Sequence, residues 1–150
     1  MLIKFKKLHP NAKRPTKNDG DEGWDLYAIE DTHIPAHSSA KIRSGLAIEM
    51  SPGYYAELFP RSGLSTKNNI IQLNSVGVID NNYRGEIISV FYNLNDYSFT
   101  VDKGSRFAQL LVKERISDVV WIEVGELTET ERGIGGFGSS DNLRGNNQYE

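Results

Sequence analysis

The chain has 150 residues, of which 38% are hydrophobic and 25% charged, and this is the length and composition of one globular domain. Because it contains no cysteine, disulfide frameworks, thiolate nucleophiles, zinc knuckles and iron–sulfur clusters are excluded. The formal net charge of −3 provides no basic field of the kind that nucleic-acid-binding proteins carry, so we expect no nucleic-acid partner.

Apolar residues never run far enough to cross a membrane. The longest uninterrupted runs, residues 26–29 and 119–122, are four residues long, whereas a spanning helix needs about 20. Residues 1–8 interleave lysines with apolar side chains and lack the apolar core and cleavage site of a secretory signal. We therefore expect no membrane partner and a cytoplasmic location.

Short strands are predicted along most of the chain. Side chains alternate between two faces over residues 2–8, 40–50, 54–59 and 87–94, which is the period of a half-buried strand. Turn-forming residues follow at 18–23, 51–53, 80–82, 93–96 and 102–105. Many short strands with regular turns favour a closed or sandwiched antiparallel sheet.

Helical structure is expected only over residues 62–69, and no amphipathic stretch is long enough for a βαβ crossover. A parallel α/β sheet is therefore not expected, and the sequence predicts an all-β domain. The composition changes once, near Arg132, beyond which glycine and polar residues leave little to bury. We expect a β-domain over residues 1–131 and a flexible glycine-rich arm over 132–150.

The arm contains Gly133-Ile-Gly-Gly-Phe-Gly138, which matches the G-x-G-x-x-G pattern of dinucleotide-binding folds. The context of the pattern differs, because Glu-Thr-Glu-Arg precedes it instead of a strand and only twelve residues follow it. We expect no Rossmann unit. Glycines still let main-chain N–H groups cradle phosphate oxygens, and Arg132 adds a guanidinium. From the residues alone two interpretations stay open, a solvated terminus and a lid over a phosphate.

A second candidate is the segment 59–65, Phe-Pro-Arg-Ser-Gly-Leu-Ser, which follows an alternating strand. Arg61 and Ser62 supply hydrogen-bond donors, and the N–H groups at the start of the predicted helix favour an anion. Alone, an Arg-Ser-Gly loop of this kind is usually only a turn.

Residues 74–88 are predicted to form a strand, a hairpin turn and another strand, with Asp80 at the turn. From spacing alone Asp80 has two interpretations. Its side chain bonds its own backbone and forms the turn, or it acts as a general base toward a water molecule. Tyr83, three residues later, is placed to form one wall of a small pocket.

In order and identity, five segments resemble the signature motifs of the homotrimeric dUTPases, the dUTP nucleotidohydrolase family. They are Gly23-Trp-Asp-Leu26, Pro60-Arg-Ser-Gly-Leu64, Gly77-Val-Ile-Asp-Asn-Asn-Tyr-Arg-Gly85, Gly104-Ser-Arg-Phe-Ala-Gln109 and Arg132-Gly-Ile-Gly-Gly-Phe-Gly-Ser139. The resemblance implies a jelly-roll-like β-barrel. It also implies a homotrimer with active sites built between chains, where the arm of one chain closes over a neighbour's pocket.

The reaction implied by this resemblance is hydrolysis of dUTP to dUMP and pyrophosphate with Mg²⁺, a step of nucleotide metabolism that keeps uracil out of DNA. Asp80 is implied to activate the water that attacks the α-phosphorus, and Asp25 to reach Mg²⁺ through the waters of the metal. In-line displacement at phosphorus depends mainly on positioning and charge neutralisation, so such a site needs no nucleophilic side chain.

The resemblance also assigns the substrate contacts. The residues implied to read the uracil edge are Asn74 and the hairpin backbone at Gly77, Val78 and Ile79. Tyr83 is implied to lie against the deoxyribose and to leave no space for a 2′-hydroxyl. The residues implied to hold the α- and β-phosphates are Arg61, Ser62, Gly63 and Gln109. Those assigned to the arm are Arg132 and Ser139 on the terminal phosphate, Phe137 stacked on the base, and the adjoining Gly138. Arg106 is expected to support a subunit interface instead of the ligand.

Four departures from the family pattern, at Glu22, Asn82, Phe107 and Ser140-Asp141, remove no group with an assigned role, although the last alters the lid. Two alternatives stay open. A dCTP deaminase shares this fold, but it needs a catalytic glutamate beside the cytosine amine. A nucleotide-sensing module would instead bind a regulatory protein partner, and its arm would act as the switch.

Overall fold

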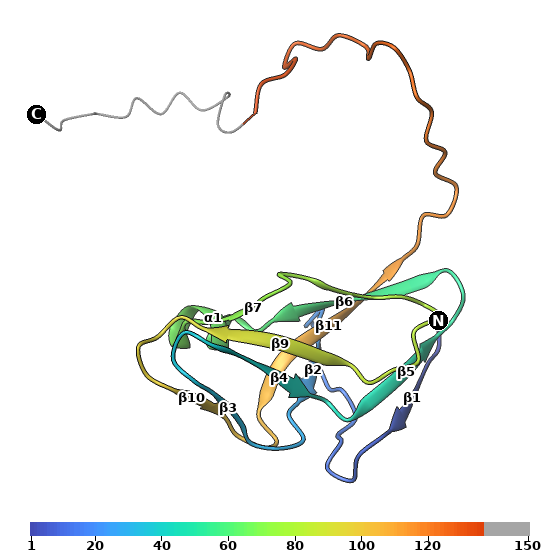
Figure 1. The fold of residues 1–150 in the computed structure, drawn as a ribbon. Coiled ribbons are helices and arrows are strands. Elements are labelled where there is room, and N and C mark those ends of the chain that lie inside the picture. Colours follow the sequence, from blue (N-terminus) through green and yellow to red (C-terminus); the bar gives the residue numbers. More distant parts are fainter. Residues whose placement is uncertain (137–150) are drawn as a thin grey trace, which may run out of the picture. The chain divides into compact units, whose positions relative to one another are not determined.

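The computed structural model describes residues 1–136 (Figure 1). Backbone contacts divide the chain into one unit over Met1–Ser117 and another that begins at Asp118. All the strands and the helix belong to the first unit. Residues 118–136, the described part of the second unit, form no helix or strand. The division predicted after residue 131 stays a prediction.

The first unit is built from antiparallel strands. The largest sheet has the order β2 (Trp24–Tyr27), β11 (Arg106–Glu114), β6 (Tyr54–Pro60) and β8 (Gly77–Ile79). A three-stranded sheet has the order β4 (Ser39–Arg43), β9 (Ile88–Asn93) and β7 (Ile70–Gln72). The two-stranded sheets pair β1 (Ile3–Lys7) with β5 (Leu46–Met50), and β10 (Phe99–Val101) with β3 (Thr32–Ile34). The all-β prediction is confirmed.

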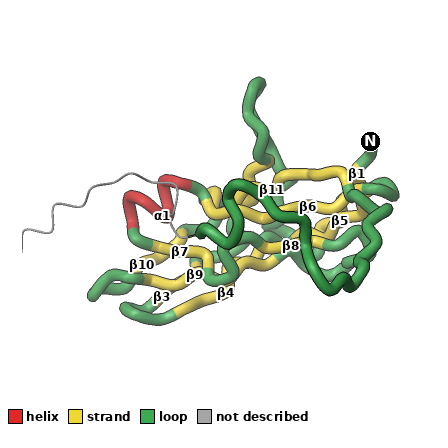
Figure 2. The backbone as a smooth tube through the Cα atoms, turned by 90° about the horizontal axis from the view of Figure 1, so that it is seen from above, coloured by secondary structure: helices red, strands yellow, loops and turns green. Residues whose placement is uncertain are grey.

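The predicted short helix is present as α1 (Ser62–Asn68), which connects β6 to β7. Figure 2 shows it at one end of the strands, next to β7. Asn69 ends the helix in the left-handed conformation, with φ of 54°. Within residues 1–136 no helix is long and apolar enough to cross a membrane.

Aliphatic and aromatic side chains from both larger sheets fill the core. At its centre the rings of Phe91 and Phe107 meet edge to face, with centroids 6.3 Å apart and planes at 80°. Such a pair contributes about 0.5–1.5 kcal/mol beyond the area that it buries. Phe107, which departs from the family pattern, therefore has a structural partner in Phe91.

The alternation over residues 40–50 was interpreted as one strand, and this is wrong. The chain bends at Ser44-Gly45, so that β4 pairs with β9 whereas β5 pairs with β1. Gly45 has φ of 66°, and a Cβ there would lie 2.8 Å from a side-chain carbon of Ile29. The even-numbered residues from 42 to 50 are still buried on both sides of the bend, which is why the sequence pattern runs through it.

The strand β9 buries its more polar side. Ser89, Phe91 and Asn93 point into the core. The opposite side forms an outer apolar face together with β7, and we use this name for Ile71, Leu73, Ile88, Val90 and Tyr92. Ile71 pairs with Tyr92 across the two strands, and Leu73 and Ile88 are exposed. An exposed apolar face of this kind is typical of a surface that binds another protein chain.

Candidate functional site

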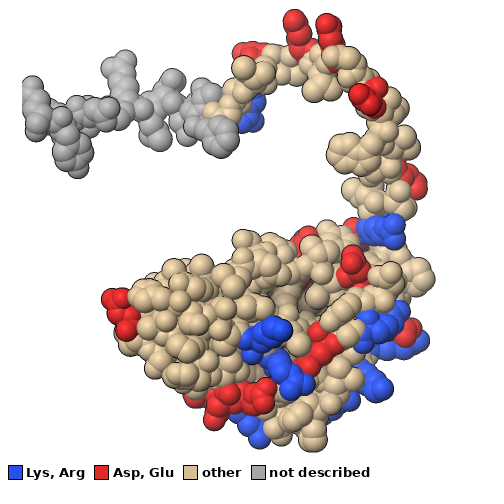
Figure 3. All heavy atoms as spheres, viewed as in Figure 1, with Lys and Arg blue, Asp and Glu red and all other residues tan. Residues whose placement is uncertain are grey.

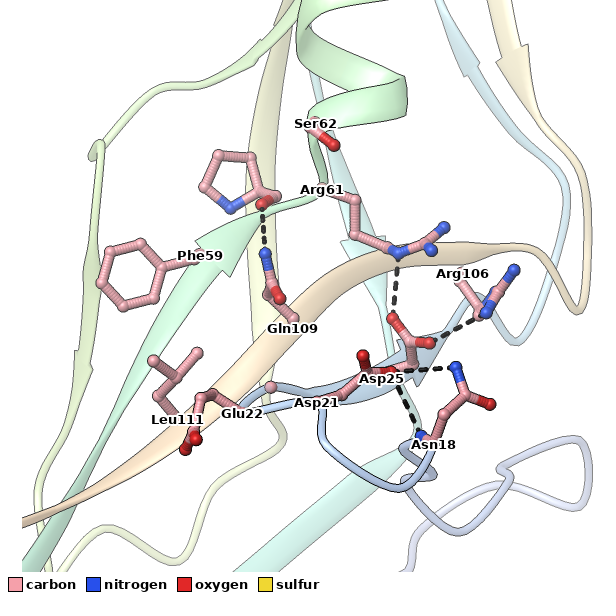
Figure 4. A pocket seen from close by; sticks show the side chains of 12 residues that line it. Asn18, Asp21, Glu22, Asp25, Phe59, Arg61, Ser62, Arg106, Gln109 and Leu111 are labelled. Atoms are coloured by element: carbon pink, nitrogen blue, oxygen red, sulfur yellow. Dashed lines mark hydrogen bonds and ion pairs between the residues drawn. The ribbon is translucent and has the colours of Figure 1, made fainter.

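A pocket of about 520 Å³ lies where β2, β11 and the end of β6 meet (Figure 4). This volume is in the range of small-molecule sites. The residues assigned to phosphate or metal that line it are Asp25, Arg61, Ser62 and Gln109. Gly63 lies just inside α1, and a Cβ added there would point into open space. The structure thus brings one half of the predicted site together.

An ion-paired cluster of Asp25, Arg61 and Arg106 forms one wall of this pocket. Arg61 Nε lies 2.9 Å from Asp25 Oδ1, and Arg106 Nη1 lies 3.1 Å from Asp25 Oδ2. The Asp25 side chain is only 14% exposed, whereas both guanidiniums reach solvent. Each guanidinium has further N–H groups that remain available to an anion in the pocket.

Neighbouring strands explain why these residues meet. Asp25 on β2 pairs with Gln109 on β11, and Ala108 on β11 pairs with Pro60, directly before Arg61. Arg106 begins β11, where a bulge shifts the register. Arg106 thus lies on the pocket wall, and its expected role at a subunit interface stays a prediction.

Gln109 is held by the backbone of β6, since its Nε2 donates to the carbonyl of Pro60 at 3.1 Å. Its Oε1 occupies the space that a side chain at residue 23 would fill, so Gly23 is required for this approach. The second N–H of the Gln109 amide is left for a ligand.

The pocket combines three carboxylates, of Asp21, Glu22 and Asp25, with the two guanidiniums of Arg61 and Arg106. Asn18 donates to the Asp21 carboxylate, but Glu22 makes no hydrogen bond or ion pair within residues 1–136. In Figure 3 acidic and basic side chains likewise lie side by side on the right and lower parts of the first unit, whereas most of the left part carries no charge. A triphosphate would therefore need positive charge beyond that of these two arginines.

The other half of the predicted site is the hairpin that follows β8. Asp80 lines a separate pocket of about 530 Å³, together with Tyr54, Tyr55, Asn81, Asn82 and Arg115. The turn is closed by the Tyr83 N–H, which donates to the Asp80 carbonyl at 3.1 Å. The Asp80 carboxylate has no hydrogen bond or ion pair with any described residue. The interpretation that its side chain forms the turn is therefore wrong.

Asn81, which the sequence analysis missed, anchors this turn. Its Nδ2 donates to the carbonyls of Met50, Ser51 and Tyr54 at 3.3, 2.8 and 2.9 Å. These bonds tie the turn to the connection between β5 and β6. The sequence showed only an amide side chain next to the proposed catalytic aspartate. Spacing alone could not identify the hydrogen-bond partners of that amide.

Tyr83 is held in place although it is 44% exposed. Its hydroxyl donates to the Glu86 carbonyl at 3.0 Å, and its ring occupies the space beside Gly85 that a side chain would need. The Glu86 carboxylate accepts from the Arg43 guanidinium and from the Gly45 N–H, and this pairing raises the pKa of Arg43. The aromatic ring is thus presented on a rigid base.

The predicted base-reading residues lie along β8 and just before it. Gly77 and Ile79 face the interior, and Val78 is 63% exposed. β8 is an edge strand of the largest sheet, so one side of its backbone has no strand partner within the first unit. Asn74 is exposed beside Gly77.

The two halves of the site do not meet within one chain. Asp80 follows Ile79, the partner of Ala56, and is therefore level with Tyr55 at the start of β6. Arg61 follows the other end of β6. At about 3.3 Å per residue, roughly 20 Å separate these positions. Asp80 and the Asp25 cluster of one chain cannot contact the same phosphate.

The described part of the arm adds one assigned residue. Arg132 is exposed in the second unit, and its Nε donates to the Gly135 carbonyl at 2.9 Å. The remaining arm residues assigned from the sequence, Phe137, Gly138 and Ser139, lie outside the described residues.

Comparison with known proteins decides the family. The dUTPase family model matches residues 11–141. The chain belongs to the dUTPase family. It is 42% identical over 141 residues to the deoxyuridine 5′-triphosphate nucleotidohydrolase of Helicobacter pylori strain 26695, covering 93% of this chain and 97% of that protein. It is 43% identical to the Picosynechococcus protein of the same name, in a match that covers 93% of this chain and 99% of that protein.

Solved dUTPases have the same architecture. The dUTPase of Staphylococcus bacteriophage 80alpha with dUpNHpp superimposes with a TM-score of 0.83 at 28% identity, covering 93% of this chain and 98% of that one. The predicted jelly-roll-like β fold and membership of a hydrolase family of nucleotide metabolism are confirmed.

Proposed function

We propose that this protein is a dUTP diphosphatase, which hydrolyses dUTP to dUMP and pyrophosphate with Mg²⁺. The observation that carries the proposal is a family match over nearly the whole chain, in which Asp25, Arg61 and Asp80, all implied to act, are present and line pockets. The relatives from Helicobacter pylori and Picosynechococcus are named for hydrolysis of this nucleotide, and the phage 80alpha enzyme was solved with dUpNHpp.

The active form is proposed to be a homotrimer with active sites shared between chains. The separation of roughly 20 Å between Asp80 and Arg61 supports sharing, because a general base must come within hydrogen-bonding distance of the attacking water. The outer apolar face supports association. So do the exposed apolar side chains that follow β11, which include Ile116, Trp121 and Leu127.

Asp80 is proposed to take a proton from the water that attacks the α-phosphorus. Its carboxylate has no competing partner among the described residues, so its oxygens are free to accept. Tyr55, on the wall of the same pocket, donates to Glu57 Oε1 at 2.9 Å, and this hydrogen bond raises the pKa of the Tyr55 phenol. The phenol therefore stays neutral near Asp80. The leaving group is pyrophosphate, and no covalent bond to the protein forms.

Asp25 is proposed to hold Mg²⁺ through water. Asp25 Oδ2 accepts a hydrogen bond from Arg106 and Oδ1 forms an ion pair with Arg61, and each oxygen keeps an acceptor site for a water. This arrangement fits a metal-bound water instead of direct coordination. Within residues 1–136, no three His, Asp or Glu side chains gather into a metal cage. When bound to the phosphate oxygens, Mg²⁺ supplies positive charge for displacement at phosphorus.

The arm over residues 132–150 is proposed to close over the pocket of a neighbouring chain. Arg132 and Ser139 would then hold the terminal phosphate, and Phe137 would cover the base. The excess of carboxylates around Asp25 supports this role, because Arg132 supplies the charge that the pocket lacks.

The base is proposed to lie on the free edge of β8, where Asn74 and the backbone of residues 77–79 read its polar edge. Tyr83 is proposed to lie against the sugar. Its hydroxyl is bonded to the Glu86 carbonyl and its ring rests over Gly85, so the ring cannot move aside for a 2′-hydroxyl.

The test is pyrophosphate release with Mg²⁺ from dUTP, run beside dCTP, dTTP and UTP. We expect release from dUTP alone, and loss of release in Asp80→Asn with the fold intact. Ammonia from dCTP would instead indicate the deaminase. Nucleotide binding without release from any substrate would indicate the nucleotide-sensing alternative.

A further inference from the structure

We infer that Gln72 sets the orientation of the Asn74 side-chain amide and thereby makes the base pocket favour uracil over cytosine. Gln72 is the last residue of β7 and is only 5% exposed, so it does not itself reach a ligand. The inference rests on the proposed function, which places the base beside Asn74 and β8. Gln72 is a positioning residue that acts through Asn74.

The contacts of Gln72 define which way its amide points. Its Nε2 donates to the carbonyl of Leu58 at 2.9 Å and to Asn74 Oδ1 at 3.1 Å. A main-chain carbonyl only accepts hydrogen bonds, so the nitrogen of Gln72 has to face Leu58. Leu58 is paired on both sides, with Gly77 and with Leu110, and its carbonyl cannot turn away.

If the Gln72 amide were turned round, its Oε1 would face the carbonyl oxygen of Leu58, and two hydrogen-bond acceptors would lie against each other. In the observed orientation Gln72 Oε1 is buried and has no hydrogen-bond partner among residues 1–136. An unpaired buried oxygen is itself unfavourable. The carbonyl of Leu58 therefore determines the orientation of the Gln72 amide. The two hydrogens of that amide bond the Leu58 carbonyl and Asn74 Oδ1.

Asn74 inherits its orientation from this arrangement. Because Asn74 Oδ1 accepts from Gln72, the Nδ2 group is the end that points elsewhere. A Cβ at Gly77 would lie 3.3 Å from Asn74 Nδ2 and 3.2 Å from Leu58 Cβ. The donor end of Asn74 therefore lies at the start of β8, and a glycine at residue 77 leaves room for it.

The chemistry of the two bases makes this orientation selective. Uracil presents a carbonyl oxygen at the position where cytosine presents an amine. An amide NH₂ donates to the carbonyl, whereas it places hydrogen against hydrogen when it faces the amine. An Asn74 amide turned the other way would accept from cytosine instead. The bond from Gln72 prevents that turn.

The test measures the binding of dUMP and dCMP to the full chain by calorimetry, so that no hydrolysis is needed. In Gln72→Met, which keeps the length of the side chain, we expect the preference for dUMP to fall by about tenfold, the order of one hydrogen bond exchanged for one unpaired group. Asn74→Ala should lose the same preference. Adding Gln72→Met to Asn74→Ala should change it no further, because residues that act through one another are not additive.

Ser89→Ala is the matched control, since Ser89 is also buried in this sheet with an unpaired side-chain oxygen. It should leave the preference unchanged. A folded Gln72→Met protein with the wild-type preference would overturn the inference, as would additive effects in the double variant. If the wild-type protein shows no preference for dUMP, the proposed function is what fails.

A measurement on the unmodified protein covers the case in which Gln72→Met does not fold. By NMR, the side-chain NH₂ of Gln72 should be protected from solvent exchange, and that of Asn74 should exchange rapidly until dUMP is added. Rapid exchange at Gln72, or no change at Asn74 on adding dUMP, would contradict the proposed arrangement.

Discussion

Mixing two inactive variants tests whether the active sites are shared. Asp80→Asn removes the proposed base and Arg61→Ala removes a phosphate ligand, and these residues lie roughly 20 Å apart in one chain, at about 3.3 Å per residue of β6. If each site takes Asp80 from one chain and Arg61 from the next, mixed trimers contain intact sites. With equal, randomly assembled chains of a cyclic trimer, about one quarter of the sites are intact.

The assay is pyrophosphate release from dUTP after the two variants are denatured, mixed and refolded together. Each variant refolded alone is the control and should stay inactive. In a second mixture, wild-type chains are combined with an equal amount of the Asp80→Asn, Arg61→Ala double variant. Shared sites again leave about one quarter active, whereas self-contained sites would leave about one half. No recovery in the first mixture together with one half in the second would refute the reasoning.

Three further predictions concern the hairpin and the metal. Asn81→Ala should lower the free energy of unfolding in urea by about 1–3 kcal/mol and reduce kcat, because three carbonyls lose their donor. The exposed neighbour variant Asn82→Ala should change stability by less than about 0.5 kcal/mol, and equal effects would contradict the anchoring role. Tyr83→Ala should raise the kcat/KM for UTP relative to dUTP by about 10- to 100-fold, while Tyr97→Ala, at an exposed tyrosine, should not. EDTA should abolish pyrophosphate release without moving the thermal midpoint; a lowered midpoint would indicate a structural metal.

Local patterns in the sequence predicted the class of fold but not the pairing of its strands. The alternation of side chains reflects which residues are buried. It continues through the bend at Gly45 because β4 and β5 both bury even-numbered residues. In β9 the outer side chains are more apolar than the buried ones. Asn93 can be buried because its amide donates to the carbonyls of Ile34 and Tyr97. Ile34 lies 59 residues from Asn93 in the sequence, a separation that a periodicity does not reach.

In the candidate site, too, some roles follow from local motifs and others only from the pairing of the strands. Asp25, Arg61 and Gln109 were assigned by their motifs, and the strand order β2-β11-β6 brings them to one pocket. The roles of Asn81 and Gln72 could not be predicted from a pattern, because they come from carbonyls that the fold places against these side chains. The separation of Asp80 from Arg61 follows from the register of β6 and β8, which is a property of the sheet.

Glu22 provides a test of the electrostatics of the pocket. It lines the pocket that holds Arg61 and Arg106, has no ion-pair partner within residues 1–136, and is one of the four departures from the family pattern. A carboxylate here opposes a bound triphosphate, so Glu22→Ala should lower the KM for dUTP by about 2- to 5-fold, the order of an exposed charge interaction. The effect should shrink as salt is raised, because the interaction is screened over about 8–10 Å.

Asp19→Ala is the matched control for Glu22→Ala, since it removes an equal charge from the same loop at a residue that does not line the pocket. If the two variants change KM equally, the effect belongs to net charge and not to the position of Glu22. If neither variant changes KM, the phosphates do not lie in this pocket, and the assignment of Arg61 and Gln109 to the phosphates is wrong. A drop in KM confined to Glu22→Ala would place the negative charge of the substrate beside the Asp25 cluster, where the two arginines alone do not neutralise it.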